Sequence, residues 1–304
     1  MMSAKAAPQP ALWGQPPSAV PAANTAATEK AERERRLALI LPREHGAWGL
    51  LLVPMITGAG IALRGSSNLF PFIFLLTAAL TLFWLRTPLE SLLGTSALRA
   101  QTPEERREVA FVVVYLGAVA ALALSMLLWV GHNPLLWPIG AAAGAALVAQ
   151  ALLKKLGRRA RMLSEIVSTI GLTSSAPAAY YVITGKFGAT GWMLWLANLI
   201  FAGNQIHYVQ LRIHSAKIAG LRAKFARGWA FVAGQIIMTL ALTIACLSGL
   251  MPAVASVAFA PLMFRGWFYF VQKPAPLLVR RLGWSELSQA VVFCVLFIAT
   301  FRAG

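Results

Sequence analysis

The stretch LPREHGAWGLLLVPMITGAGIALRGSSNLFPFIFLLTAALTLFWLR at residues 41–86 decides the fold class. It holds two apolar runs, at 46–63 and 69–85, which are separated only by a short turn around Arg64. A helix needs about 20 apolar residues to cross the hydrocarbon core of a bilayer, and both runs approach that length. The stretch therefore predicts two consecutive membrane-spanning helices.

The same pattern continues to the end of the 304-residue chain. Apolar residues make up 58% of the sequence and charged residues only 12%, whereas about a quarter of a soluble domain is charged. Seven more apolar runs predict spans at residues 109–129, 134–153, 163–185, 189–211, 228–249, 252–271 and 284–301. We expect an all-α membrane protein whose nine helices form one bundle.

The Lys and Arg residues predict the orientation of this bundle, because cytoplasmic loops retain positive charge. With nine spans, 24 of the 27 lie on the side of the N-terminus, and only Arg64, Lys186 and Arg302 lie on the other. We expect a multi-pass protein of the cell (inner) membrane with its N-terminus in the cytoplasm and its C-terminus outside. The net charge of +17 then needs no nucleic acid partner, and it favours contact with anionic membrane lipids.

The chain ahead of the spans predicts a cytoplasmic tail at residues 1–38, followed by the membrane domain at 39–304. Up to residue 28 the tail is rich in Ala, Pro, Ser and Gln, which is typical of disorder. The charged sequence EKAERERRL at 29–37 favours a helix at the membrane surface.

Small residues in the run at 134–153 predict a close helix contact. Gly140 and Gly144 have the GxxxG spacing that lets two helix backbones approach each other. The spacing is compatible with packing inside one bundle and with dimerisation.

The acidic and metal-binding residues exclude several kinds of site. All ten acidic residues are Glu, so EF-hand, Walker-B and Asp-rich metal motifs are absent. Two cysteines inside apolar runs predict neither a disulfide nor a zinc site. The four histidines are loosely spaced, so we expect no metal; a bis-His site from His45 and His207 is the less favoured alternative.

Polar residues at the start of the first span predict part of a functional site, because an ionisable side chain in hydrocarbon costs roughly 2.5–3.5 kcal/mol. We expect Glu44 and His45 to act as catalytic acid and base. Arg43 and Trp48 are candidates for binding the polar head of a substrate. Arg and Trp are also ordinary anchors at the headgroup level, which is the structural alternative for these two.

A second polar group occupies the end of the sixth span, and a helix this polar cannot face lipid. Helical spacing divides it between two adjacent faces, one with Asn204, His207 and His214, the other with Gln205, Tyr208 and Arg212. We predict that it lines a cavity. His207 is the catalytic candidate, and Asn204, Gln210 and Arg212 are candidates for substrate binding. Pairing with Glu165 and the Ser and Thr residues of the fifth span is the structural alternative.

A third polar group follows the second span. Arg86 and Glu90 are candidates for substrate binding, with a plain i,i+4 ion pair as the alternative. Arg265 in the eighth span and Glu286 at the start of the ninth are expected to find polar partners. All three groups are expected to meet in one hydrated chamber at the inner leaflet.

Two motifs carry a resemblance to a known family. LPREHGAWGLLLVP at 41–54 resembles the opening of YwiC-like membrane proteins, and HYVQLRIHSAK at 207–217 resembles their second polar motif. The resemblance covers about residues 39–304, and it implies no particular activity.

A more distant resemblance is to the UbiA superfamily of intramembrane prenyltransferases, through TPEERREVAFVVVYLG at 102–117 and SAPAAYYVITGKF at 175–187. It implies nine helices and a cavity that opens at the cytoplasmic loops after helices 2 and 6. Those enzymes hold Mg²⁺ and an isoprenoid diphosphate on Asp-rich motifs. This chain has no Asp, so such a magnesium site is not supported, and Arg43, Arg86, Arg212 and Lys217 are expected to bind an anion directly.

The combined prediction is a UbiA-like membrane protein that binds or modifies an isoprenoid or quinone-like amphiphile in a cytoplasm-facing cavity. As an enzyme it would be a prenyltransferase-like transferase with an Asp-free site. A non-catalytic membrane assembly factor and a proton-coupled transporter are the alternatives.

Overall fold

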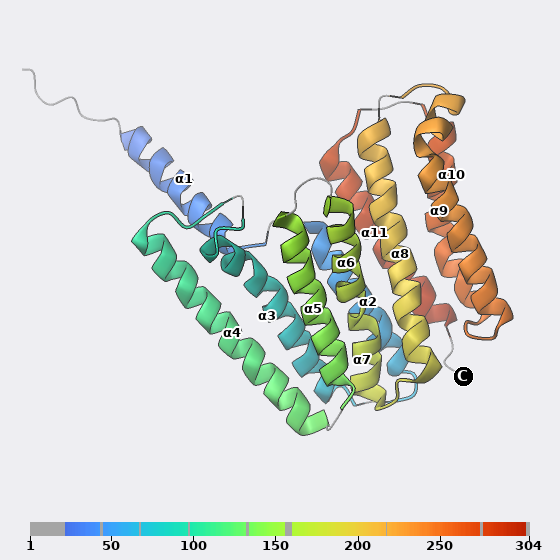
Figure 1. Cartoon of the computed structure of the whole chain (residues 1–304), viewed down its shortest axis with the longest axis horizontal. Coiled ribbons are helices and arrows are strands. Elements are labelled where there is room, and N and C mark those ends of the chain that lie inside the picture. The colour runs from blue at the N-terminus through green and yellow to red at the C-terminus, as the bar shows by residue number, and fades with distance from the viewer. Residues whose placement is uncertain are drawn as a thin grey trace, which may run out of the picture.

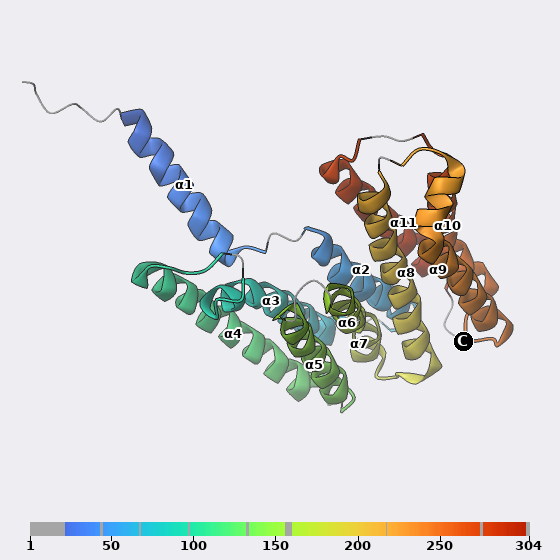
Figure 2. The same ribbon diagram turned by 45° about the horizontal axis from the view of Figure 1, so that its top comes forward.

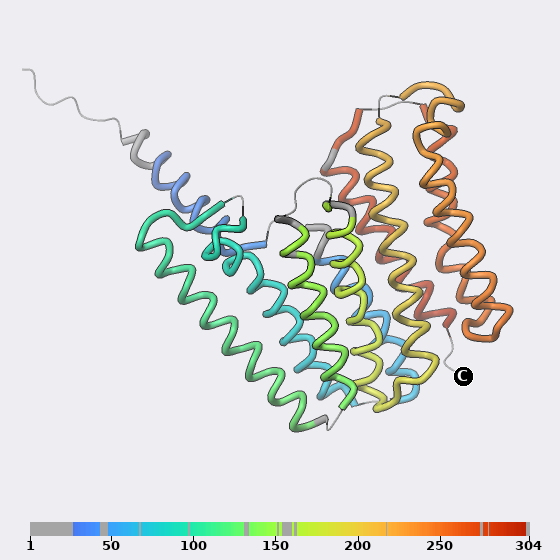
Figure 3. Tube along the Cα trace, viewed as in Figure 1, coloured from blue at the N-terminus to red at the C-terminus, as the bar shows by residue number. Residues whose placement is uncertain are grey.

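The structure, a computed structural model, describes residues 22–42, 45–66, 68–96, 98–131, 134–155, 160–216, 218–273 and 276–301. Within these ranges the regular secondary structure is entirely helical. The helices are α1 (Ala22–Ile40), α2 (His45–Ala62), α3 (Phe70–Leu92), α4 (Pro103–Gly131), α5 (Leu136–Lys155), α6 (Arg161–Thr173), α7 (Ser175–Thr184), α8 (Gly188–Ser215), α9 (Leu221–Leu247), the 3-10 helix η2 (Ala253–Phe259), α10 (Ala260–Val271) and α11 (Val279–Thr300). All but α1 run side by side in one bundle (Figures 1 and 3).

The outer surface of the bundle is apolar, as expected for a membrane protein. Among the described residues, six segments are long and apolar enough to cross a membrane, by length and composition: Phe70–Leu92, Pro103–Val130, Leu163–Thr184, Leu221–Leu247, Ala253–Val271 and Arg280–Thr300. Large apolar side chains face outward, with Trp129 74% and Leu247 84% exposed. An apolar surface this extensive is compatible with lipid and not with water, so the chain is a membrane protein.

The centre of the bundle is α2, which packs against α7, α11, α6 and α8. Met55 is fully buried in the core around it. The contact with α7 is exceptionally close at Gly58, where an added Cβ would lie 2.0 Å from the carbonyl oxygen of Ala176. Gly60 faces α11 in the same way, with its added Cβ 2.5 Å from the Ile298 side chain. Glycine at position 58, where the neighbour is backbone, therefore sets the distance between α2 and α7.

Packing of Gly140 and Gly144 inside the bundle, the favoured of the two expected contacts, is wrong for the residues that the structure describes, and dimerisation through them stays a prediction. A Cβ added at either glycine meets nothing within 4 Å. The neighbouring helix instead approaches α5 through its own glycine, because a Cβ on Gly171 would lie 2.9 Å from the Cβ of Ala146. The small residue that matters is thus on α6, facing α5.

The fifth apolar run forms two helices, α6 and α7, instead of one. Pro177 has no N–H with which to bond the carbonyl of Thr173 four residues earlier, so the helix is interrupted between them. The hydroxyl of Ser175 donates to the carbonyl of Leu51 on α2 at 3.1 Å, and that of Thr173 donates to the Thr169 carbonyl at 2.7 Å. These polar residues are satisfied by backbone inside the bundle, which explains a buried span of low hydropathy.

Helix α1 projects from the bundle and is held at its C-terminal end (Figures 1 and 2). Trp84 of α3 donates its indole N–H to the Ile40 carbonyl at 3.0 Å. Arg35 binds Glu105 at 2.8 Å, and this hydrogen bond, together with the carboxylate charge, raises the pKa of Arg35 above its usual value. Glu105 also completes a capping box with Thr102 at the start of α4, with N–H to side-chain oxygen distances of 3.1 and 3.4 Å. The ion pair thus joins α1 to the capped end of α4.

Candidate functional site

The polar residues of the sixth predicted span lie on the C-terminal half of α8, at the end of the bundle where α9 and α11 begin (Figure 1). The two faces expected from helical spacing contact different neighbours. Asn204 donates to the Met238 sulfur on α9 at 3.6 Å, while Gln205 donates to the Glu286 carbonyl on α11 at 2.8 Å. The polar side chains of α8 therefore face neighbouring helices, with α9 on one side and α10 and α11 on the other.

The face toward α10 and α11 holds a buried ion pair. Arg265 of α10 donates to the Glu286 carboxylate on α11, and their side chains are only 11% and 15% exposed. The Arg265 guanidinium also stacks on the ring of Tyr208 of α8, 4.0 Å from its centroid. These contacts confirm that Arg265 and Glu286 find polar partners, here each other, and they connect three helices at one point.

A second set of contacts surrounds Tyr269 of α10. The Arg212 guanidinium lies 5.4 Å and the Lys224 ammonium 4.9 Å from the centroid of its ring. The Tyr269 hydroxyl lies 2.5 Å from that of Ser215 and donates to the Ser215 carbonyl at 3.1 Å. Lys224 is 3% exposed and donates to the Gln272 carbonyl at 2.5 Å, at the C-terminal end of α10. Arg212, which the sequence suggested for substrate binding, lies in this packed region.

We call the side chains of Tyr208, Arg212, Lys224, Arg265, Tyr269 and Glu286 the α8–α10–α11 cluster. It contains three cations and one carboxylate. Several of its buried atoms have no hydrogen-bond partner among the residues that the structure describes, namely Arg212 Nε, Arg265 Nε and Nη2, and Glu286 Oε2. Buried ion pairs stabilise weakly but fix geometry, because breaking one leaves an uncompensated charge. The cluster therefore positions the polar end of α8.

A hollow of about 280 Å³ opens between the polar end of α8 and the start of α9. We call it the α8–α9 hollow, and its lining residues are His207, Gln210, Leu211, His214, Arg227, Gly228, Ala230 and Phe231. The His207 ring packs edge-on against Phe231, with centroids 5.5 Å apart. Gly228 lets α9 approach α8 closely beside the hollow, because an added Cβ would lie 3.0 Å from the Leu211 side chain. Imidazole, amide and guanidinium groups thus share one hollow with apolar side chains.

Helix α6 contacts the polar end of α8 through Gln210. Gln210 donates its amide N–H to Glu165 Oε2 at 3.3 Å, which is the contact between the fifth and sixth spans that the sequence allowed. His214 Nδ1 lies 2.8 Å from the Gln210 carbonyl one turn earlier on α8. Gln210 is thereby held at the edge of the α8–α9 hollow.

The residues after the second span lie elsewhere. Arg86 and Glu90 form the i,i+4 ion pair at 3.0 Å on α3, which packs against α4, α7 and α1. Trp48 of α2 packs edge-on against Phe83 of α3, with ring centroids 4.7 Å apart. The structure therefore brings His207 and Gln210 together in one hollow and places Arg86, Glu90 and Trp48 around α3.

Other candidate residues lie outside what the structure describes. These are Arg43, Glu44 and Lys217, together with the side chain of His45. In the described part of the chain, no group of three His, Cys or Glu side chains is placed to hold a metal ion.

Arg227 is the lining residue that the sequence did not single out. It is one of five Lys and Arg residues between the sixth and seventh spans, and their shared positive charge indicated only a cytoplasmic loop. Which of the five turns toward α8 depends on how α9 packs. The sequence carries no separate signal for that choice.

The family comparison fits the first half of this bundle. The family model described as YwiC-like protein matches residues 41–180, from the motif LPREHGAWGLLLVP into α7. Over these residues the chain is similar to the YwiC-like family. Helices α8 to α11 lie beyond the matched residues, and so does the motif at 207–217. No curated protein and no solved structure matches the chain.

Proposed function

We propose that this YwiC-like membrane protein binds the polar head of an isoprenoid or quinone-like amphiphile in the α8–α9 hollow, on the cytoplasmic side of the cell membrane. The observation that carries the proposal is the mixed lining of the hollow. Arg227, His207 and Gln210 offer charge and hydrogen bonds, whereas Leu211 and Phe231 offer apolar contact. Ligand sites of small molecules combine these two kinds of lining in this way.

The surroundings of the hollow suit a ligand with a long apolar tail. Ile213 on α8 and Trp229 on α9 are 51% and 69% exposed on helices with apolar outer surfaces. A tail can lie along such side chains in the bilayer while the head stays in the hollow. His207 is the lining residue that we assign to proton transfer, should the bound head group react. Glu44, His45, Arg43, Arg86 and Arg212 remain proposed contributors to the site.

The proposed topology has nine spans in a UbiA-like arrangement. Its N-terminus lies in the cytoplasm and its C-terminus outside. In this proposal α6 and α7 form the fifth span, and η2 and α10 the eighth. The shorter apolar stretches Trp48–Ala62 and Leu136–Gln150, together with α8, are then added to the six long candidates. The distribution of Lys and Arg supports this count, because any change of one span would move a basic loop to the outer side.

Replacing Arg227 with glutamine is expected to weaken amphiphile binding about tenfold. The change removes a charge-assisted hydrogen-bond donor, a contact that contributes about 1.5–3 kcal/mol. Arg227 is exposed, so the variant keeps the fold. The measurement is native mass spectrometry of the full chain in mild detergent, titrated with a long-chain isoprenoid quinone and, separately, with farnesyl diphosphate.

The control for this experiment is Arg222→Gln, which removes an equally exposed cation from α9 outside the hollow. We expect it to bind like the wild type. Equal binding by the two variants would refute the assignment of the hollow. Absence of binding by either probe to the wild type would refute the ligand class.

A further inference from the structure

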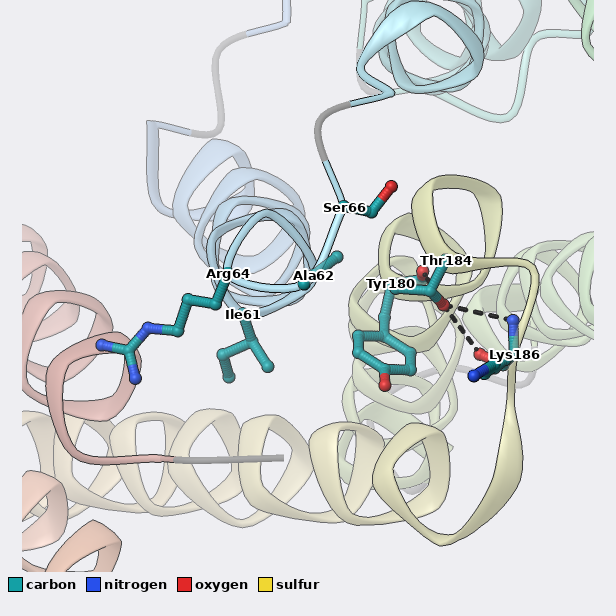
Figure 4. Close-up of a pocket in the computed structure, with 8 residues that line it drawn as sticks. Ile61, Ala62, Arg64, Ser66, Tyr180, Thr184 and Lys186 are labelled. Atoms are coloured by element: carbon teal, nitrogen blue, oxygen red, sulfur yellow. Dashed lines mark hydrogen bonds between the residues drawn. The ribbon is translucent and has the colours of Figure 1, made fainter. Parts of the chain in front are cut away.

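A second and larger hollow lies at the opposite end of the bundle, between the C-terminal ends of α2 and α7 (Figure 4). Its volume is about 430 Å³, and we call it the α2–α7 hollow. The side chains that matter below are Arg64, Ser66, Tyr180, Thr184 and Lys186. Nothing in the proposed function uses this hollow.

The charge at this end of the bundle is unusual. The turns and the chain end on this side, at 63–69, 130–135, 185–188, 247–252 and 301–304, contain three Lys and Arg residues and no Glu. Two of those three, Arg64 and Lys186, line the α2–α7 hollow, and the third, Arg302, lies outside the described residues. Basic residues are scarce on one side of a membrane protein. Here two of them line one hollow, and the described residues of these turns contain no Glu to neutralise them.

The guanidinium of Arg64 is held in place by the end of α11. Its Nη1 donates to the Phe301 carbonyl at 3.0 Å and its Nη2 to the Ala299 carbonyl at 3.2 Å. Figure 4 shows the side chain extending toward that helix. A guanidinium has five N–H donors, so three have no acceptor within the described ranges. The two carbonyls carry only partial charge, and the site keeps positive charge.

The walls of the hollow are fixed by hydrogen bonds between the two turns. The Ser66 hydroxyl donates to the Ile183 carbonyl at 3.1 Å, which joins the chain after α2 to α7. Thr184 Oγ1 accepts the N–H of Lys186 at 3.2 Å, across Gly185 in the left-handed region at φ 68°, and donates to the Tyr180 carbonyl of α7 at 2.8 Å. The last carbonyl groups of α7 thus accept hydrogen bonds from side chains, which reduces the partial negative charge at the C-terminal end of this helix.

Two donors remain directed at this space. Tyr180 is 8% exposed, and its hydroxyl has no hydrogen-bond partner among the described residues. Lys186 is exposed on the far side of the hollow from Arg64, with the Tyr180 ring between them (Figure 4). A hydroxyl donor that lines a hollow together with two cations is a suitable environment for an oxyanion.

We propose that the α2–α7 hollow binds a phosphate group, through Lys186, Tyr180 and the free N–H groups of Arg64. The volume of the hollow, about 430 Å³, is many times the roughly 30 Å³ that one water molecule occupies in the liquid. The hollow therefore has room for a phosphate group. Two sources supply this chemistry on that side of the membrane: the headgroup of an anionic phospholipid and free inorganic phosphate.

The test uses the full chain in neutral detergent with two probes. Inorganic phosphate is titrated by calorimetry, and phosphatidylglycerol by native mass spectrometry with diacylglycerol as the phosphate-free comparison. We expect Lys186→Gln and Tyr180→Phe each to weaken binding at least fivefold. Lys273→Gln, which removes an exposed cation outside both hollows, should leave it unchanged.

The two probes separate the sources of the phosphate group. Binding of phosphate alone supports a free anion, and binding of phosphatidylglycerol without phosphate supports a lipid headgroup. The proposal is overturned if neither probe binds, or if Lys186→Gln and Lys273→Gln behave alike. The result is independent of the α8–α9 hollow, because Lys186→Gln leaves Arg227 and His207 intact.

Discussion

Replacing Glu286 with glutamine is expected to destabilise the protein by about 3–5 kcal/mol, because it leaves Arg265 buried without its counter-charge. The guanidinium would keep its stacking on Tyr208, which does not neutralise it. Thermal unfolding in detergent should show a clearly lower midpoint. The loss should be largest for signals that report on the packing of α8 against α10 and α11.

Two comparisons separate this effect from a general loss of charge. Glu108→Gln breaks an ion pair with Arg36 whose side chains are 44% and 49% exposed, and it should cost at most about 1 kcal/mol. The double variant Arg265→Met/Glu286→Met removes both buried charges and should be more stable than Glu286→Gln alone. Equal midpoints for Glu286→Gln and Glu108→Gln would mean that the buried pair does not hold these helices.

Replacing Gly58 with alanine is expected to disrupt the centre of the bundle. The new Cβ would lie 2.0 Å from the Ala176 carbonyl oxygen, and because that neighbour is backbone, α2 and α7 must move apart. Overpacking typically costs 1–3 kcal/mol, and a clash with backbone lies at the upper end of that range or beyond. Thermal unfolding and the monodisperse fraction after solubilisation are the measurements.

Gly49 offers a matched control on the same helix. An alanine Cβ there meets nothing within 4 Å, and alanine favours a helix over glycine by about 1 kcal/mol. Gly49→Ala should therefore be neutral or slightly stabilising. If Gly58→Ala unfolded at the same temperature as Gly49→Ala, the close contact between α2 and α7 would be wrong.

The helical spacing on α8 predicted its surroundings well, since a 3.6-residue period places Gln205, Tyr208 and Arg212 on one face. That face contacts α10 and α11, and the adjacent face contacts α9. Arg265 and Glu286 were expected to find polar partners because charges are too costly to leave alone in hydrocarbon. Their pairing with each other follows from the same requirement.

Packing distances could not be predicted in this way. The GxxxG spacing of Gly140 and Gly144 indicated a close contact, whereas close approaches between helices occur at Gly58 and Gly171, which stand in no GxxxG motif. A glycine's neighbour depends on the rotation of two helices about their axes, and sequence spacing within one helix does not give it. The same limit hid the position of Arg227 beside His207.

The surroundings of the candidate residues were predicted in part. His207 and Gln210 do line a hollow, whereas Arg212 packs on Tyr269 inside the cluster. A polar residue on a spanning helix needs either a ligand or a partner, and spacing alone does not separate these two cases. The separation depends on which neighbouring helix supplies an aromatic ring or a carboxylate.

The most direct test of the α8–α9 hollow is photo-crosslinking with a long-chain isoprenoid quinone that carries a photoreactive group on its head. Labelled peptides are identified by mass spectrometry of the full chain in membranes. We predict labelling concentrated at 206–215 on α8 and 225–232 on α9, with strong reduction in Arg227→Gln. Labelling centred on α3 and α4, or spread evenly around the bundle, would contradict binding in this hollow.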